Sequence, residues 1–283
     1  MHHEVRHPFS ASARLAALAL MAVLAGPAGA QGAESAAPSA IPPGYRLVWS
    51  DEFKTDGHPD PGKWVYDTAR NKPGWHNNEL QYYTGARLQS ARVQGGKLLI
   101  TARKETLSSE PDWGGQRYTA ARLLTRGKAD WTYGFFEVRA RMPCGKGTWP
   151  AIWMLGTGGL WPEDGELDIL EHQGHRPNRV SSAVHMAAGH GGHAVGGATR
   201  LETACGAFHN YQMHWTPEKL YFSVDGMVHF HYANLKHGAA SWPFDKPQFM
   251  ILNIAIGGDL GGPVDDAIFP VTMEVEYLRV YQK

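Results

Sequence analysis

Three observations make the sequence predict an all-β protein, a sandwich or barrel of antiparallel strands. At least ten short segments of apolar or alternating residues follow one another along the chain. The 33 glycines and 18 prolines supply turns between these segments, because both residues favour turn geometry. After residue 31, no segment keeps a helical period over three turns. Short strands separated by turns are typical of sandwiches and barrels.

Two segments show strand character most clearly. Residues 135–142 alternate between apolar and charged side chains, as a half-buried strand does. Residues 220–230 contain Asp225-Gly226 between two apolar runs, which is a strong signal for a tight hairpin. The other predicted strands, in chain order, are residues 45–49, 97–103, 149–155, 166–171, 180–186, 211–215, 249–256 and 275–281.

The N-terminus has the pattern of a secretory signal peptide, residues 1–30. Arg6 and Arg14 give a positive start, residues 15–24 form an apolar core, and residues 28–30 form a small-residue cleavage site. The apolar core is too short to span a membrane. We therefore expect a protein that is secreted or periplasmic.

The rest of the chain predicts one domain. Residues 31–43 are rich in Ala, Ser and Pro and are expected to form a disordered lead-in. Residues 44–283 show no internal repeat and no second composition regime, so they are predicted to be a single domain. No later segment is apolar enough for a membrane span.

Charge and cysteine content narrow the possible partners. Lys and Arg together number 27, as do Asp and Glu, so no basic surplus indicates nucleic acid and no charge run indicates a membrane surface. Cys144 and Cys205 are the two cysteines. Export permits disulfides, and these two residues are the candidate pair, although spacing alone leaves the bond open.

Three carboxylates stand within six residues of an apolar, strand-like run, at Glu166, Asp168 and Glu171. Like charges on one strand face are destabilising, which suggests a use for them. In a regular strand Glu166 and Asp168 share a face and Glu171 points away. A β-bulge between Asp168 and Glu171 would bring all three onto one face. The glutamates would then lie about 13 Å apart along the backbone. Inward-leaning carboxyl groups would approach about 5–5.5 Å, as in a retaining glycosidase.

Four interpretations of these acids compete: a solvated or salt-bridged edge strand, a site for a hard cation, a non-catalytic sugar-binding groove, and glycoside hydrolysis. Hydrolysis needs one ionised carboxylate to attack the anomeric carbon and one protonated acid for the leaving oxygen. Asp168 between them would share a proton with the nucleophile and hold the pKa values apart. Trp149, Trp153 and Trp161 lie just upstream, and indole rings suit the apolar C–H faces of sugars.

The sequence around the acids resembles glycoside hydrolase family 16, in particular its laminarinase-like endo-β-1,3-glucanase branch. The matching blocks are GTWPAIWML at 147–155, WP at 161–162, GELDILE at 165–171, and further blocks at 51–53, 77–83, 241–245, 252–258 and 278–281. The resemblance implies a β-jelly roll sandwich, concanavalin A-like, of two curved antiparallel sheets with a concave substrate cleft. It implies that Glu166 is the nucleophile, Asp168 the assisting acid and Glu171 the general acid/base.

The resemblance also implies which residues line the sugar subsites. These are Asn78, Arg122, Trp149, Trp153 and His185, with His185 placed near the acid/base. We add Trp161 as a further substrate-binding residue because of its position beside the acids.

Metal binding is a further implication of the resemblance. Many members hold a structural calcium on the convex side, and Glu52 and Glu276 stand at the corresponding positions. Relatives usually have Asp at the second position, so the longer Glu is a departure. The histidines of residues 185–193 offer another candidate metal site.

The expected function is that of a secreted retaining endo-β-glucanase. It would act on β-1,3-glucan of the laminarin type, or on mixed β-1,3/1,4-glucan, by double displacement. The alternatives are a hydrolase or transglycosylase of the same family acting on another polysaccharide, and a non-catalytic β-glucan-binding protein. No cofactor is required for catalysis. The expected partner is the glucan alone, bound by a monomer, without nucleic acid or membrane.

Overall fold

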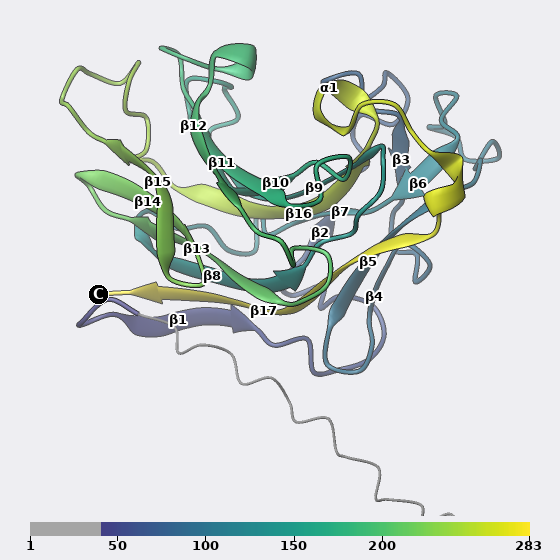
Figure 1. Cartoon of the computed structure of the whole chain (residues 1–283), viewed down its shortest axis with the longest axis horizontal. Coiled ribbons are helices and arrows are strands. Elements are labelled where there is room, and N and C mark those ends of the chain that lie inside the picture. The colour runs from purple at the N-terminus through teal and green to yellow at the C-terminus, as the bar shows by residue number, and fades with distance from the viewer. Residues whose placement is uncertain (1–40) are drawn as a thin grey trace, which may run out of the picture. The chain divides into compact units, whose positions relative to one another are not determined.

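The computed structural model describes residues 41–283, which belong to one compact unit. The predicted signal peptide and most of the predicted lead-in lie outside the described residues. The regular secondary structure of the described chain is almost entirely β-strand, and the strands form two stacked sheets (Figure 1). None of its helices is long and apolar enough to cross a membrane.

The larger sheet has ten strands and contains both ends of the described fold. In spatial order its main path is β15 (Met227–Ala233), β14 (Lys219–Val224), β13 (His209–Trp215), β8 (Gly134–Arg141), β17 (Val271–Gln282), β5 (Leu98–Lys104), β6 (Tyr118–Ala120) and β3 (Gln81–Tyr83). Off this path, β1 (Arg46–Asp51) pairs with β17, and β4 (Ala91–Val93) pairs with β5.

The smaller sheet has seven strands and contains the acidic segment near its centre. Its order is β12 (Val195–Arg200), β11 (Arg179–His185), β10 (Glu166–His172), β9 (Thr148–Gly156), β16 (Gln248–Ile256), β7 (Arg122–Leu124) and β2 (Val65–Tyr66). Three short helical segments complete the fold: η1 (Gly191–His193), α1 (Gly258–Gly261) and η2 (Asp266–Ile268).

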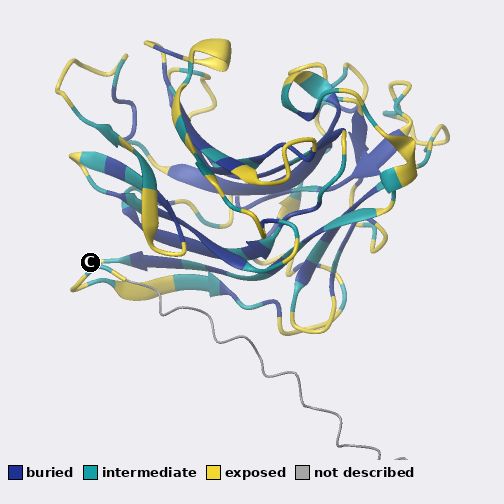
Figure 2. Ribbon diagram, viewed as in Figure 1, coloured by how far each residue is buried: buried dark blue, intermediate teal, exposed yellow. Residues whose placement is uncertain are grey.

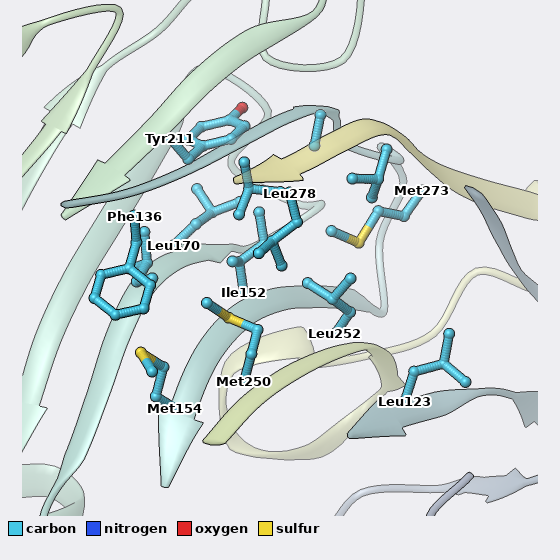
Figure 3. Close-up of a cluster of buried hydrophobic side chains, with 14 of the residues drawn as sticks. Leu123, Phe136, Ile152, Met154, Leu170, Tyr211, Met250, Leu252, Met273 and Leu278 are labelled. Carbon is cyan, nitrogen blue, oxygen red and sulfur yellow. The ribbon is translucent and has the colours of Figure 1, made fainter. Parts of the chain in front are cut away.

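The hydrophobic core lies between the two sheets. Ile152 and Met154 of β9 and Met250 of β16 point toward Phe136 of β8 and Leu278 of β17 (Figure 3). All five are fully buried, and in Figure 2 the strands of both sheets are largely dark blue, the colour of buried residues. Burying such side chains stabilises a fold by about 1.5–3 kcal/mol each. The opposite face of the seven-stranded sheet, named here the acid face, remains for polar chemistry.

Most predicted strands are confirmed, including the Asp225-Gly226 hairpin. Both turn residues have positive φ, at 49° and 81°, as a two-residue type I′ turn requires. Six short or irregular strands were not predicted: β2, β3, β4, β6, β7 and β12. The predicted antiparallel arrangement needs one amendment, since β3 and β6 pair in parallel.

Cys144 and Cys205, the candidate pair, form a disulfide with Cα atoms 5.8 Å apart. The bond joins the segment after β8 to the segment after β12, close to the end of β10, where His172 Nε2 lies 4.0 Å from Cys205 Sγ.

Removing this disulfide should destabilise the protein. The bond closes a loop of 61 residues, and a loop of this length contributes about 4 kcal/mol through lost entropy of the unfolded chain. The double variant Cys144→Ala/Cys205→Ala should therefore unfold at lower urea concentration than the wild type. Reducing agent should shift only the wild type. Equal midpoints for the oxidised wild type and the variant would contradict this expectation.

Candidate active site

A bulge in β10 places the three acids on the acid face. Glu166 pairs with Leu155 of β9, Asp168 with Trp153, and Glu171 with Ala151. The register slips between Asp168 and Leu170 on the β9 side, and between Asp168 and Glu171 on the β11 side. The predicted bulge is thus confirmed. The intervening and flanking apolar residues Leu167, Ile169 and Leu170 are at most 1% exposed and belong to the core.

The environment of the three carboxyl groups favours their protonated forms. Burial, and then the neighbouring Asp168, raise the pKa of Glu166 and of Glu171, each to about 8. Burial raises the pKa of Asp168 to about 7, and this side chain is only 3% exposed. Three close, desolvated carboxyl groups cannot all be ionised at neutral pH, so the cluster holds protons there.

These raised pKa values predict a pH-dependent stability. Below their ordinary pKa the carboxyl groups are protonated in folded and unfolded chains alike. As pH rises from the ordinary pKa values to the raised pKa values of the folded protein, the folded protein holds more protons than the unfolded chain. Its stability therefore falls across this interval. Glu166→Gln removes one such group, so it should exceed the wild type by about 2–4 kcal/mol near pH 8 and by little near pH 4. Urea unfolding across this range measures the difference, with exposed Glu163→Gln as control. Parallel curves would contradict it.

Each of the two glutamates accepts a hydrogen bond from an indole N–H. Trp161 Nε1 donates a hydrogen bond to Glu166 Oε2 at 2.5 Å, and Trp149 Nε1 donates to Glu171 Oε1 at 3.1 Å. Each donor lowers the pKa of its glutamate and so opposes the effect of burial. The indole groups therefore orient the two carboxyl groups and stabilise their ionised forms.

His185 approaches the acids from β11. Its Nδ1 accepts a hydrogen bond from the Gly191 N–H at 3.1 Å, so in the neutral ring the proton is on Nε2. Nε2 lies 3.1 Å from Asp168 Oδ2, at ion-pair distance but without hydrogen-bond alignment. His185 was expected near Glu171, on which it acts electrostatically; it pairs with Glu166 in the sheet, and its ring lies against Asp168.

The arrangement does not fit a metal centre, although donor atoms of Glu166, Asp168 and His185 lie within 4.8 Å of one another. A hard cation such as Ca²⁺ takes six to eight oxygen ligands, and the protonated Nε2 has no lone pair for a metal. Among the described residues, no group of three or more metal-donating side chains includes His190 or His193.

Arg122 is held between two indole rings on the acid face. Its guanidinium lies 5.1 Å from the ring centroid of Trp75 and 4.7 Å from that of Trp153, and it pairs with Asp67 at 3.0 Å. Such stacking fixes a long side chain that would otherwise be mobile. Trp153 Nε1 in turn donates to Asn253 Oδ1 at 2.7 Å.

Asn78 lies at one end of this face, in a loop that packs against α1. Its Nδ2 donates to Asp259 Oδ1 at 2.7 Å, and Asp259 N–H donates to the Asn77 carbonyl at 2.9 Å. Glu79 follows in the same loop, where burial raises its pKa. The predicted residue Asn78 is therefore positioned by α1, not by a strand.

Sequence reasoning missed several polar residues of this face, chiefly Asn253, Asp67, Glu79 and Asp259. Asn253 offered a signal, since it is the one amide within the apolar run 249–256. The others lie outside the strands, and Asp67 and Asp259 have partners that are distant in sequence, Arg122 and Asn78.

A sequence profile described as "Glycosyl hydrolases family 16" matches residues 75–277. The chain belongs to this family. The β-glucanase of Rhodothermus marinus is 48% identical over 254 residues, covering 85% of this chain and 86% of that protein. The glucan endo-1,3-β-glucosidase of Cryptopygus antarcticus is 37% identical, covering 82% and 90% of the two chains.

Solved structures agree with this family membership. A non-specific endo-β-1,3(4)-glucanase of family 16 superposes with a TM-score of 0.85 at 49% identity, covering 87% of this chain and 98% of that chain. The laminarinase from Rhodothermus marinus gives 0.79 at 47% identity, covering 84% and 97%. The two stacked sheets are accordingly the β-jelly roll of family 16, and the protein is a glycoside hydrolase by family.

The calcium expected from the family does not fit the residues of this family 16 chain. Glu52 accepts two hydrogen bonds from the Arg279 guanidinium, at 2.9 and 2.8 Å, and Glu276 accepts one from Arg139 at 2.7 Å. Arg279 holds the pKa of Glu52 below its usual range. Each carboxylate thus already has a cationic partner, which would repel a divalent ion. In this structure the predicted pair Glu52 and Glu276 forms ion pairs with Arg279 and Arg139.

The loop that presents Trp161 depends on a buried carboxylate that was not predicted. Asp164 is 7% exposed. Its Oδ2 accepts the Leu160 N–H at 2.9 Å, and its Oδ1 pairs with Lys246 Nζ at 2.7 Å. Lys246 lowers the pKa of Asp164, which keeps the carboxylate ionised.

Replacing Asp164 by Ala should therefore weaken catalysis by this family 16 enzyme. Without the carboxylate, Trp161 loses its fixed position, and one hydrogen bond to a charged group is worth about tenfold in rate. The pKa of Glu166 should rise without the Trp161 hydrogen bond, which moves the acidic limb of the kcat/KM profile to higher pH if Glu166 must be ionised. A pH–rate profile measures this shift, with exposed Glu163→Ala as the control. An unmoved limb would show that Asp164 does not act through Trp161.

Proposed function

We propose that this protein is a secreted, retaining endo-β-glucanase that hydrolyses β-1,3-glucan, including mixed β-1,3/1,4-glucan. The observation that supports this most directly is the acid face of β10, where Glu166 and Glu171 each receive an indole hydrogen bond. A family 16 relative, named as a non-specific endo-β-1,3(4)-glucanase, was crystallised with 1,3-β-D-cellobiosyl-glucose at its active site.

In the proposed first step, Glu166 attacks the anomeric carbon while Glu171 protonates the departing glycosidic oxygen. The bond to the leaving sugar breaks as the bond to Glu166 forms, which gives a glycosyl-enzyme. Both glutamates have a pKa raised to about 8, but Glu166 receives the shorter indole hydrogen bond, 2.5 Å against 3.1 Å for Glu171, which favours ionisation of Glu166 over Glu171. The raised pKa of Glu171 suits it to hold a proton near neutral pH.

In the second step, Glu171 takes a proton from water, and the water oxygen displaces Glu166 from the anomeric carbon. The product has the same anomeric configuration as the substrate, because two inversions have occurred. Asp168 is proposed to share a proton with Glu166 and so to compensate its changing charge. The Nε2–H of His185 faces Asp168 and would limit the negative charge there.

The glucan is proposed to lie over the remaining side chains of the acid face. Trp149 and Trp153 supply apolar surface for C–H faces, while Arg122 and Asn78 supply hydrogen-bond donors for hydroxyl groups. The fixed positions of these groups, by stacking on Trp75 and by the bond to Asp259, reduce the entropy lost on binding. A single chain contributes all of them, so we propose that the enzyme acts as a monomer.

Release of reducing ends tests the function. Purified protein is incubated with linear β-1,3-glucan, mixed-linkage β-1,3/1,4-glucan and agarose, and the products are separated by size. We expect internal cleavage of the two glucans and none of agarose. The anomer formed first, read by proton NMR, should be β. Absence of products from both glucans would overturn the proposal, and a first-formed α anomer would overturn the retaining mechanism.

A further inference from the structure

A small cavity opens beside Glu166, outside the row of acids. Its volume is about 140 Å³, and its walls include Arg126, Leu155, Leu160, Trp161 and Phe249. Pockets for drug-sized ligands measure about 300–1,000 Å³. The cavity is therefore suited to one ring and not to a polymer chain.

The cavity combines apolar walls with one cationic group. Phe249, with Leu124, Ile251 and the packed side chains of Trp153 and Leu155, forms an apolar cluster that is separate from the main core. The Arg126 guanidinium lies over the Phe249 ring, 5.5 Å from its centroid. Phe249 is only 3% exposed and supports Arg126 from below, whereas Trp161 is 49% exposed. A sugar ring offers the matching surfaces, since its C–H groups suit the exposed indole and its hydroxyl groups accept hydrogen bonds from the guanidinium.

The cavity is next to the catalytic residues, although none of the three acids lines it. Leu155 on its wall pairs with Glu166 in the sheet. Trp161 forms both a wall of the cavity and the hydrogen bond to Glu166. A ring in the cavity would therefore lie one side chain away from a sugar at Glu166, which is the reach of a single-residue branch.

The loop around the cavity is shaped by glycine. Gly159 has a φ of +83°, and a Cβ there would lie 3.7 Å from Arg126 Nη2. A Cβ on Gly158 would collide with the Asp164 carboxylate. These glycines let the loop pass close to Asp164, which binds the Leu160 N–H and so positions Leu160 at the cavity. The cavity is thus held by a fixed loop.

We propose that this cavity is an accessory subsite for a single sugar ring carried as a branch on the glucan chain. The proposal rests on the proposed function, because the main chain must lie across the acids for its branch to reach the cavity. The backbone of the glucan does not need the cavity, because the cavity lies beside the row of acids and has room for only one ring. The subsite would direct cleavage toward branched units of the polysaccharide.

The test compares two substrates of matched length, a linear β-1,3-glucan oligosaccharide and one with a single β-1,6-linked glucosyl branch. Arg126→Ala and Leu160→Ala each remove one wall without touching the catalytic residues. There are two matched controls. Arg46→Ala changes an exposed arginine of the ten-stranded sheet. Leu235→Ala changes a leucine whose side chain is 68% exposed, against 67% for Leu160. The measured quantity is kcat/KM for each pair of enzyme and substrate.

We expect each cavity variant to lose about tenfold in kcat/KM on the branched substrate, equivalent to about 1.4 kcal/mol, and to keep its activity on the linear one. The controls should match the wild type on both. Equal losses on both substrates, or no loss on the branched one, would overturn the branch subsite while leaving the proposed function intact. A wild type inactive on the linear substrate would overturn the proposed function, and the subsite with it.

Discussion

Replacing Glu166 by Gln should reduce kcat on β-1,3-glucan by about 10⁴-fold or more, as loss of a catalytic nucleophile does in other enzymes. An amide cannot attack the anomeric carbon, yet its oxygen can still accept the Trp161 N–H that now reaches Glu166. Glucan binding should therefore persist. Reducing-end assays measure the rate, and calorimetric titration with an oligosaccharide measures the binding.

The control for this variant is Glu163→Gln, the same chemical change at an exposed residue three positions earlier. It should leave the rate unchanged. Glu166→Ala with added azide extends the test, because azide can enter from the face that the carboxylate vacates and should give an α-glycosyl azide. Near-full activity of Glu166→Gln would remove Glu166 from the nucleophile's role, and a β product would refute the assigned stereochemistry.

Replacing Glu171 by Gln should have the second largest effect, about 10³-fold on glucan, the middle of the range for general acid–base catalysis. The loss should shrink for an activated aryl glycoside, whose leaving group departs without a proton. Steady-state and burst kinetics on the two substrates measure the difference. An equal loss on both would assign Glu171 to binding instead of proton transfer.

The pH profile of the Glu171 variant supplies a second readout. Burial raises the pKa of Glu171 to about 8, so the wild type should lose activity above that pH as the acid loses its proton. Glu171→Gln has no such proton, and its residual activity should lack the alkaline limb. A limb at the same pH in both proteins would mean that another group titrates there.

The strands that the sequence predicted are those whose pattern is local. In β8, apolar and charged residues alternate, and the Asp225-Gly226 turn fixes the neighbouring hairpin by itself. By contrast β12, with the sequence VGGATR, has glycines where a strand pattern needs side chains. β3 and β6 are three residues each and pair in parallel across a long stretch of chain. Such pairing depends on tertiary contacts that a local pattern does not contain.

The same distinction holds for the site. The three acids and the bulge follow from spacing within one strand, so they could be predicted from a few adjacent residues. Trp161 and Trp149, which orient the two glutamates, are also close to them in sequence. The groups that hold the other side chains could not be predicted, because their partners are remote: Trp153 and Asn253 are 100 positions apart, and Asn78 and Asp259 are 181 apart. The arginine partners of Glu52 and Glu276 were missed for the same reason, since Arg279 and Arg139 reach these carboxylates only in the folded sheet.

The pairing of β1 with β17 has a consequence for modular architecture. Arg46 lies opposite Gln282, so the polypeptide enters and leaves the jelly roll at neighbouring points of the ten-stranded sheet, while the acids belong to the other sheet (Figure 1). A further domain fused at either end would be tethered there without obstructing the acid face. The length and stiffness of a linker at either end would then set the effective concentration of such a domain at the acids.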